Sequence, residues 1–92
     1  MTYRIETAST RLKRELRRIP RKDRGRIGEV VQSLAENPIP HGSIQLIANV
    51  YRIRVGNYRI IYKVFEDEKL IIIGRIARRS EDTYKQIASL FN

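Results

Sequence analysis

The chain contains no cysteine, a single histidine and no apolar run of membrane-spanning length. The absence of cysteine excludes disulfides and thiolate metal sites. One histidine, His41, excludes a ribonuclease that works with a histidine pair, and its Pro- and Gly-containing loop favours a solvated side chain. Residues 1–8 alternate polar with apolar residues and lack the apolar segment of a secretion signal, so we predict a cytoplasmic protein.

Positive charge is the property that the chain has in excess. Its 92 residues carry 19 Lys and Arg against 10 Asp and Glu, which gives a formal net charge of +9. Such an excess indicates a polyanionic partner, and nucleic acid is favoured because basic groups gain affinity by releasing counterions from phosphates. A strongly acidic protein partner would satisfy the same charge. The length and composition predict one small domain over residues 1–92.

Hydropathy patterning in the first part of the chain predicts one strand and two helices. Alternation over residues 2–6 is typical of a half-buried strand. Apolar residues at helical spacing then predict a first helix that Pro20 closes. Pro20 also suits the first turn of a second helix, which ends before Asn37-Pro38. The two helices are expected to form a hairpin.

The rest of the chain is predicted to form strands and a last helix. Alternating Ile, Val and Tyr residues indicate three strands, placed near residues 50–55, 58–65 and 70–77. Turns are expected at Gly56-Asn57 and at residues 66–69. Whether residues 44–47 begin the first of these strands early is open. Ser80 is a candidate cap for a helix over residues 81–90, which completes an α+β fold of order βααβββα.

The strand pair around Gly56-Asn57 carries the main candidate site. A turn at these two residues sets Arg54 directly opposite Arg59. Like charges facing each other destabilise a sheet, which indicates an anion between them, and the planar guanidinium matches a phosphate bidentately. The same face also carries Arg52 and Lys63. An ordinary solvated arginine face is an equally weighted alternative.

The end of the last predicted strand adds to this basic patch. Arg78 and Arg79 end a strand that topology returns beside the strand of Arg59. Arg79 is predicted to clamp a phosphate, and Tyr84 to stack on a base. The alternative for Tyr84 is a core position on an amphipathic helix.

The helix hairpin presents a second basic surface. Residues 11–26 contain nine basic residues, among them Arg17 and Arg21, against two acidic ones. This density favours docking to RNA or to an acidic partner over an ordinary solvated helix face. The acidic run at residues 66–68 lies in a tight turn and does not indicate a metal site.

Two segments resemble the RelE/ParE superfamily of small bacterial toxins. Residues 51–62, Tyr-Arg-Ile-Arg-Val-Gly-Asn-Tyr-Arg-Ile-Ile-Tyr, look like its signature hairpin. Residues 76–79 with Tyr84 beyond them look like the strand-end arginine and C-terminal tyrosine of the RelE branch. The resemblance implies a small twisted antiparallel β-sheet with the N-terminal helix hairpin on one face, a C-terminal helix, a cognate RelB-like antitoxin and cleavage of mRNA on the ribosome.

The chemistry that this resemblance implies is attack of a ribose 2′-OH on the adjacent phosphate, without metal or other cofactor. Arg54, Arg59 and Arg79 would offset the charge that develops on the phosphate. Some RelE-like toxins carry Lys where this chain has Arg52 and Arg54, and an arginine cannot serve as a base. Tyr84 therefore takes the role in proton transfer by elimination.

The remaining basic residues are predicted to bind RNA; they are Arg52, Lys63, Arg78, Arg17 and Arg21. Three functions stay open at this stage. They are a ribosome-dependent endoribonuclease, a ParE-like toxin that binds and inhibits DNA gyrase, and an RNA-binding module without catalytic activity. The nuclease prediction depends on the guanidinium groups of Arg54, Arg59 and Arg79 converging on one phosphate.

Overall fold

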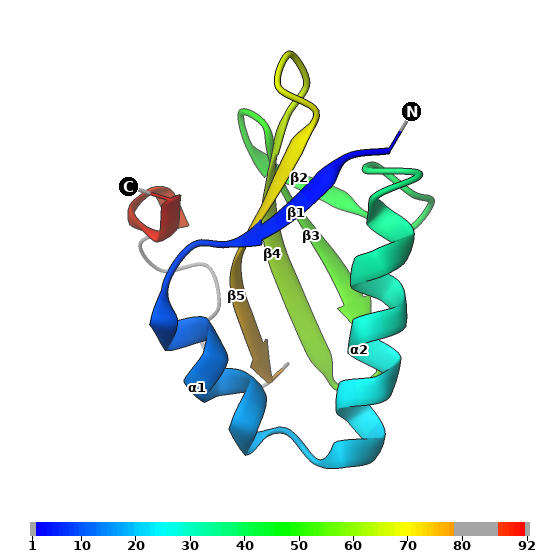
Figure 1. Cartoon of the computed structure of the whole chain (residues 1–92), viewed down its shortest axis with the longest axis vertical. Coiled ribbons are helices and arrows are strands. Elements are labelled where there is room, and N and C mark those ends of the chain that lie inside the picture. Colours follow the sequence, from blue (N-terminus) through cyan, green and yellow to red (C-terminus); the bar gives the residue numbers. More distant parts are fainter. Residues whose placement is uncertain (1, 79–86, 92) are drawn as a thin grey trace.

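A five-stranded sheet with helices at one face and one edge forms the framework of the molecule (Figure 1). The computed structural model describes residues 2–78 and 87–91. Its elements are β1 (Arg4–Thr7), α1 (Thr10–Arg18), α2 (Arg21–Leu34), β2 (Ile44–Ile47), β3 (Val50–Val55), β4 (Tyr58–Phe65), β5 (Leu70–Arg78) and the 3-10 helix η1 (Ile87–Phe91). The strand order across the sheet is β1-β5-β4-β3-β2. This arrangement confirms the predicted α+β fold.

The sheet differs from the prediction in direction and in strand number. β1 runs parallel to β5, with Arg4 opposite Leu70, so the sheet is mixed rather than wholly antiparallel. Period-two alternation indicates which side chains share a face of the sheet, but it does not indicate the direction of the neighbouring strand. The parallel pairing of β1 could therefore not be predicted from the sequence. Residues 44–47 form the separate strand β2, because Asn49 with φ 64° turns the chain back into β3.

The two helices occupy different positions around the sheet. α2 packs on one face, whereas α1 runs along the edge of β5 beyond the part that β1 covers (Figure 1). Leu12 of α1 and Ile27 of α2 are both 1% exposed and belong to one apolar cluster with β4 and β5. The predicted hairpin is thus present, but only its second helix covers a face. No helix within the described residues is long and apolar enough to cross a membrane.

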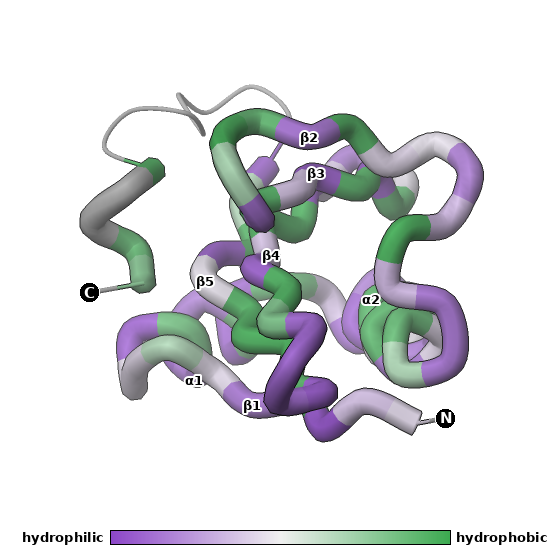
Figure 2. The backbone as a smooth tube through the Cα atoms, turned by 90° about the horizontal axis from the view of Figure 1, so that it is seen from above, coloured by the Kyte–Doolittle hydropathy of each residue, from purple (hydrophilic) through white to green (hydrophobic). Residues whose placement is uncertain are grey.

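The C-terminal 3-10 helix η1 packs on the side of the sheet away from α2 (Figure 2). The sequence predicted an α-helix over residues 81–90, of which residues 81–86 lie outside the described part. Contact with β5 occurs at Gly74, where a Cβ atom would lie 2.6 Å from Cζ of Phe91. Only a glycine leaves room for the Phe91 ring at this distance.

Gly74 also marks an irregularity of the β4–β5 pair. Ile61 pairs with Arg75 and Tyr62 with Ile73, which leaves Gly74 as an extra residue on β5. A bulge of this kind inverts the alternation of the residues after it. Ile73 and Ile76 consequently both face the core, and both are at least 95% buried.

Replacing Gly74 with alanine is expected to destabilise the fold by about 1–3 kcal/mol, because the added methyl group displaces Phe91. Urea denaturation measures the effect, and a Phe91→Ala background should reduce it. Gly25→Ala is the matched control. No atom lies within 4 Å of its Cβ position in α2, so this change should stabilise the helix by up to about 1 kcal/mol. Equal tolerance of both changes would contradict the contact.

Tyr62 connects the core to the loop that precedes β2. The side chain is fully buried, and the centroid of its ring lies 5.9 Å from that of the stacked Tyr51 ring. Its hydroxyl donates a hydrogen bond of 2.8 Å to the Pro38 carbonyl oxygen. Burial raises the pKa of Tyr62 to about 12 from its usual 10.0. The folded protein therefore keeps this proton at pH values where the unfolded chain loses it.

Tyr62→Phe is expected to cost about 1 kcal/mol at neutral pH through loss of the hydrogen bond to Pro38. The contribution of Tyr62 is fully present below pH 10.0 and falls as the pH rises toward about 12, since ionisation then stabilises the unfolded parent. The stability difference between parent and variant should shrink or reverse over this range. Denaturant titrations at a series of pH values measure it, and a constant difference would contradict the assigned pKa.

Candidate functional site

The β3–β4 hairpin places Arg54 and Arg59 directly opposite each other, as predicted. Gly56 adopts φ 60° in the intervening turn, a conformation that glycine adopts without strain. Tyr51, Ile53 and Val55 of β3 face the core with α2, so alternation puts Arg54 and Arg59 on the other side of the sheet. We call this side, with Arg52, Arg54, Arg59 and Lys63, the basic sheet face.

The Arg54–Arg59 pair carries two positive charges at facing positions of neighbouring strands. Arg54 is exposed and Arg59 is half-buried. Like charges at facing positions cost stability unless an anion lies between them. The pair is therefore suited to hold an anionic group with two forked donors from one side.

The other two members of the basic sheet face are placed differently. Arg52 is only 6% exposed between its strand neighbours Ile44 and Ile61, and its Nε has no hydrogen-bond partner within the described part of the chain. A buried guanidinium gains strongly from a nearby anion. Lys63 lies further along β4, and its Nζ is 5.1 Å from the centroid of the Phe65 ring. Lys63 is thus four residues away from Arg59.

Two of the predicted site residues, Arg79 and Tyr84, lie outside the described residues. The strand that precedes them returns beside β4 as expected, since Ala77 pairs with Arg59. Arg78 pairs with Tyr58, which is a core residue. The bulge at Gly74 therefore turns Arg78 to the side of the sheet opposite Arg54 and Arg59. Of the predicted catalytic residues, the structure brings together Arg54 and Arg59.

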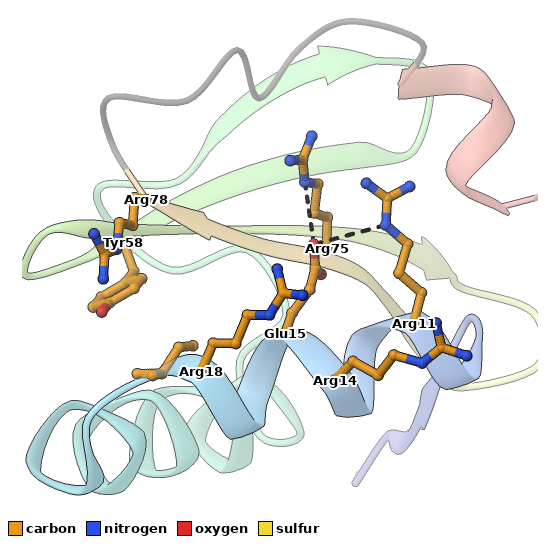
Figure 3. A pocket seen from close by; sticks show the side chains of 8 residues that line it. Arg11, Arg14, Glu15, Arg18, Tyr58, Arg75 and Arg78 are labelled. Carbon is orange, nitrogen blue, oxygen red and sulfur yellow. Dashed lines mark ion pairs between the residues drawn. The ribbon is translucent and has the colours of Figure 1, made fainter.

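Arg78 instead lines a pocket between α1 and the end of β5 (Figure 3). The pocket has a volume of about 570 Å³. Its lining residues are Arg11, Arg14, Glu15, Arg18, Ile19, Tyr58, Arg75 and Arg78. We call it the α1–β5 pocket. The predicted RNA-binding residues Arg17 and Arg21 are exposed near the junction of the two helices and do not line it.

Glu15 holds the α1–β5 pocket together. Its carboxylate lies 3.4 Å from Nε of Arg75 and 3.9 Å from Nε of Arg11, as the dashed lines in Figure 3 mark. It also accepts a hydrogen bond of 3.3 Å from the backbone N–H of Ile76. β1 pairs with β5 only as far as Ile73, so α1 and Glu15 cover the edge that β1 leaves.

This pocket was not predicted from the sequence. Three of its arginines and Glu15 fall at positions 11, 14, 15 and 18, a spacing that puts them on one face of α1. That spacing was a usable signal. No signal in the sequence indicated that Arg75 and Arg78 line the pocket, because their positions depend on the bulge at Gly74.

Comparisons with known proteins identify the family. Residues 6–83 match the family model described as the ParE toxin of type II toxin-antitoxin systems, parDE. The chain is 34% identical over 90 residues to a protein of Methanocaldococcus jannaschii named as a RelE1 toxin, covering 92% of this chain and 98% of that protein.

Solved structures agree with this result. The archaeal RelE–RelB complex from Pyrococcus horikoshii OT3 contains a chain that superposes with a TM-score of 0.76 at 27% identity, covering 88% of this chain and 99% of that one. An arginine-to-alanine variant of Escherichia coli RelE in the free state shares the fold, with a TM-score of 0.77 at 16% identity over 99% of this chain and 95% of that one. The chain therefore belongs to the RelE/ParE superfamily, the toxins of type II toxin–antitoxin systems.

Proposed function

We propose that this toxin is a RelE-like endoribonuclease that cuts mRNA on the ribosome in the cytoplasm and thereby stops translation. The observation that carries the proposal is the facing pair of Arg54 and Arg59 on the basic sheet face. Two guanidinium groups at this position match the non-bridging oxygens of one phosphodiester. An interaction that strengthens as negative charge develops on those oxygens accelerates the reaction.

The proposed reaction is an in-line attack of a ribose 2′-oxygen on the adjacent phosphorus. A bond forms between the 2′-oxygen and phosphorus, and the bond from phosphorus to the 5′-oxygen breaks. The products are a 2′,3′-cyclic phosphate and a 5′-OH, so one proton leaves the 2′-oxygen and one reaches the 5′-oxygen. The RNA itself supplies the nucleophile, and the reaction requires no metal ion.

Each basic residue has a part in this reaction. Arg54 and Arg59 orient the phosphate and offset its charge. Arg52 adds a buried positive charge two residues before Arg54. Arg79 is proposed as a third guanidinium, and Tyr84 as the stacking and proton-transferring group, both on the evidence of the sequence alone.

We also propose a RelB-like antitoxin as partner. The archaeal relative was solved as a RelE–RelB complex. The formal net charge of +9 makes an acidic segment the natural complement, and covering Arg54 and Arg59 would stop cleavage. Co-expression with the product of the neighbouring gene should restore growth and yield a copurifying complex. Failure of both would count against this partner.

Induced expression followed by mapping of mRNA 5′ ends tests the nuclease directly. Cuts should appear in translated messages, in phase with codons, and should carry 5′-OH ends. They should disappear when translation initiation is blocked. An absence of phased cuts in cells that stop growing would remove the proposal.

A ParE-like inhibitor of DNA gyrase is the second candidate, favoured by the ParE description of the matching family model. The same expression experiment separates the two. DNA breaks and gyrase inhibition with translation intact would decide for the gyrase inhibitor. Normal growth with RNA binding retained would instead indicate an RNA-binding module without catalytic activity.

A further inference from the structure

The α1–β5 pocket takes no part in the cleavage proposed above, yet it is strongly basic. Its lining holds five arginines and one glutamate, a formal charge of +4 from five positive groups and one negative group. The Glu15 carboxylate is already engaged by Arg75, Arg11 and the Ile76 N–H. All five cations are arginines, the residue whose planar fork suits phosphate oxygens.

We propose that the α1–β5 pocket binds a flanking phosphodiester of the RNA strand whose reacting phosphate lies at Arg54 and Arg59. This inference rests on the proposed function, since it takes the basic sheet face as the place of the reacting phosphate. The pocket would then set how the strand leaves the cleavage site.

The two sites are neighbours at one end of the sheet. The pocket reaches around the edge of β5, since Arg75, the partner of Ile61, lies on the side of Arg59, whereas Arg78 lies on the other side (Figure 3). Tyr58 lines the pocket and its neighbour Arg59 pairs with Arg54, so consecutive residues of one strand serve opposite faces. A strand that leaves Arg54 and Arg59 can pass around the β3–β4 turn or the edge of β5 to reach the pocket, because both lie beside Arg59. A phosphate that flanks the reacting one, and not the reacting phosphate itself, is the group that would reach the pocket.

A further arginine lies on the route between the two sites. Nη1 of Arg26 in α2 is 3.5 Å from the position that a Cβ would take on Gly56, at the tip of the β3–β4 hairpin. Arginines consequently lie on the basic sheet face, at the hairpin turn and in the pocket. A line of separate positive groups fits a polymer with one charge on every unit.

The size of the pocket agrees with this ligand. A volume of about 570 Å³ lies within the range of sites that hold small organic groups, and it admits a phosphate with an attached sugar. Ile19 and Tyr58, both at least 93% buried, form an apolar base for the sugar.

The test is binding of RNA that cannot be cleaved because its riboses carry 2′-O-methyl groups. Arg14→Ala with Arg18→Ala removes two exposed arginines of the pocket and leaves Glu15 in place. Lys13→Ala with Lys22→Ala removes the same charge from exposed helical positions outside the pocket. Thermal denaturation of both variants checks that the fold is kept.

The pocket variant should lose at least about tenfold in affinity for an RNA of about ten nucleotides, and its salt dependence should fall by about 0.7 in slope per lost contact. The lysine variant should lose about twofold. A trinucleotide that covers only the reacting phosphate should bind the parent and both variants alike. This pattern supports a flanking phosphate subsite.

Three results would overturn the inference. Equal losses in the two variants would show a diffuse charge effect. An equal loss for the trinucleotide would show that the pocket does not hold a flanking phosphate. Unchanged RNA affinity with weaker binding of a polyglutamate peptide would assign the pocket to an acidic protein segment. Because the RNA is uncleavable, this binding experiment does not depend on nuclease activity. If the parent protein shows the predicted binding pattern but does not cut mRNA, the proposed function is wrong, whereas the pocket is still a subsite for a second phosphate of the bound RNA.

Discussion

Arg59→Ala is expected to lower the rate of mRNA cleavage by about 10²–10³-fold, the usual effect of removing one group that stabilises transition-state charge. The reason is that Arg59 lies opposite Arg54 and supplies one of the two guanidinium groups of this facing pair. Cleavage of a translated message in a cell-free translation system, followed by quantification of new 5′ ends, measures the rate. Arg59→Lys keeps the charge but not the fork, so it should recover only part of the activity.

Arg4→Ala is the matched control for this loss of one arginine. Arg4 is exposed on β1 and forms a surface ion pair of 3.5 Å with Glu6. It lies opposite Leu70, seven residues along β5 from Ala77, the partner of Arg59. Its removal should change cleavage by less than about twofold, because surface ion pairs contribute little. Retention of full activity by Arg59→Ala, with a folded protein, would be incompatible with the proposed site.

Glu15→Ala is expected to give the largest loss of stability among the polar substitutions considered, about 2–3 kcal/mol. It removes the carboxylate from Arg75, whose side chain is 18% exposed, and the acceptor of the Ile76 N–H at the edge of β5. Glu15→Gln keeps an acceptor for that N–H and should cost roughly half as much. Urea denaturation measures both.

Glu29 provides the control for the Glu15 substitutions. It is exposed on α2, and no ion pair or hydrogen bond of its side chain is found among the described residues. Glu29→Ala should therefore change the free energy of unfolding by less than about 0.5 kcal/mol. If Glu15→Ala lowered the free energy of unfolding as little as Glu29→Ala, the contacts of Glu15 with Arg75 and the Ile76 N–H would not stabilise the edge of β5.

The hairpin register was predictable because two local signals agree. Alternation assigns Tyr51, Ile53 and Val55 to one face, and the Gly56-Asn57 turn fixes which residues face each other. Every predicted pair from Val55–Tyr58 to Arg52–Ile61 is present. The facing of Arg54 and Arg59 follows from these signals alone.

The features that the sequence did not predict depend on contacts between distant segments. The parallel β1–β5 pair joins residues 4–7 to residues 70–73, and nothing within either segment encodes their relative direction. The bulge at Gly74 lies where η1, which is distant in the sequence, packs against β5. Since this bulge inverts the alternation, it moves Arg78 from the expected face into the α1–β5 pocket.

The burial of Arg52 is a second feature that the sequence did not predict. Its alternating position on β3 predicted an outward side chain, and the register confirms that it shares a face with Arg54. The neighbouring strand β2 nevertheless brings Ile44 alongside, and Arg52 becomes 6% exposed. Whether a residue on a sheet face is covered depends on the neighbouring strands and helices, which the alternation within its own strand does not report.

A double-mutant cycle on Arg54 and Arg59 tests most directly whether the two side chains hold one phosphate. Arg54→Ala, Arg59→Ala and the double variant are compared for affinity toward the uncleavable RNA and for cleavage rate. If both guanidinium groups bind the same phosphate, their effects are coupled by about 0.5–3 kcal/mol, so the double variant loses less than the sum of the two single variants by that amount. Losses that simply add would mean that the two arginines act on separate groups, which would contradict a single phosphate site at Arg54 and Arg59.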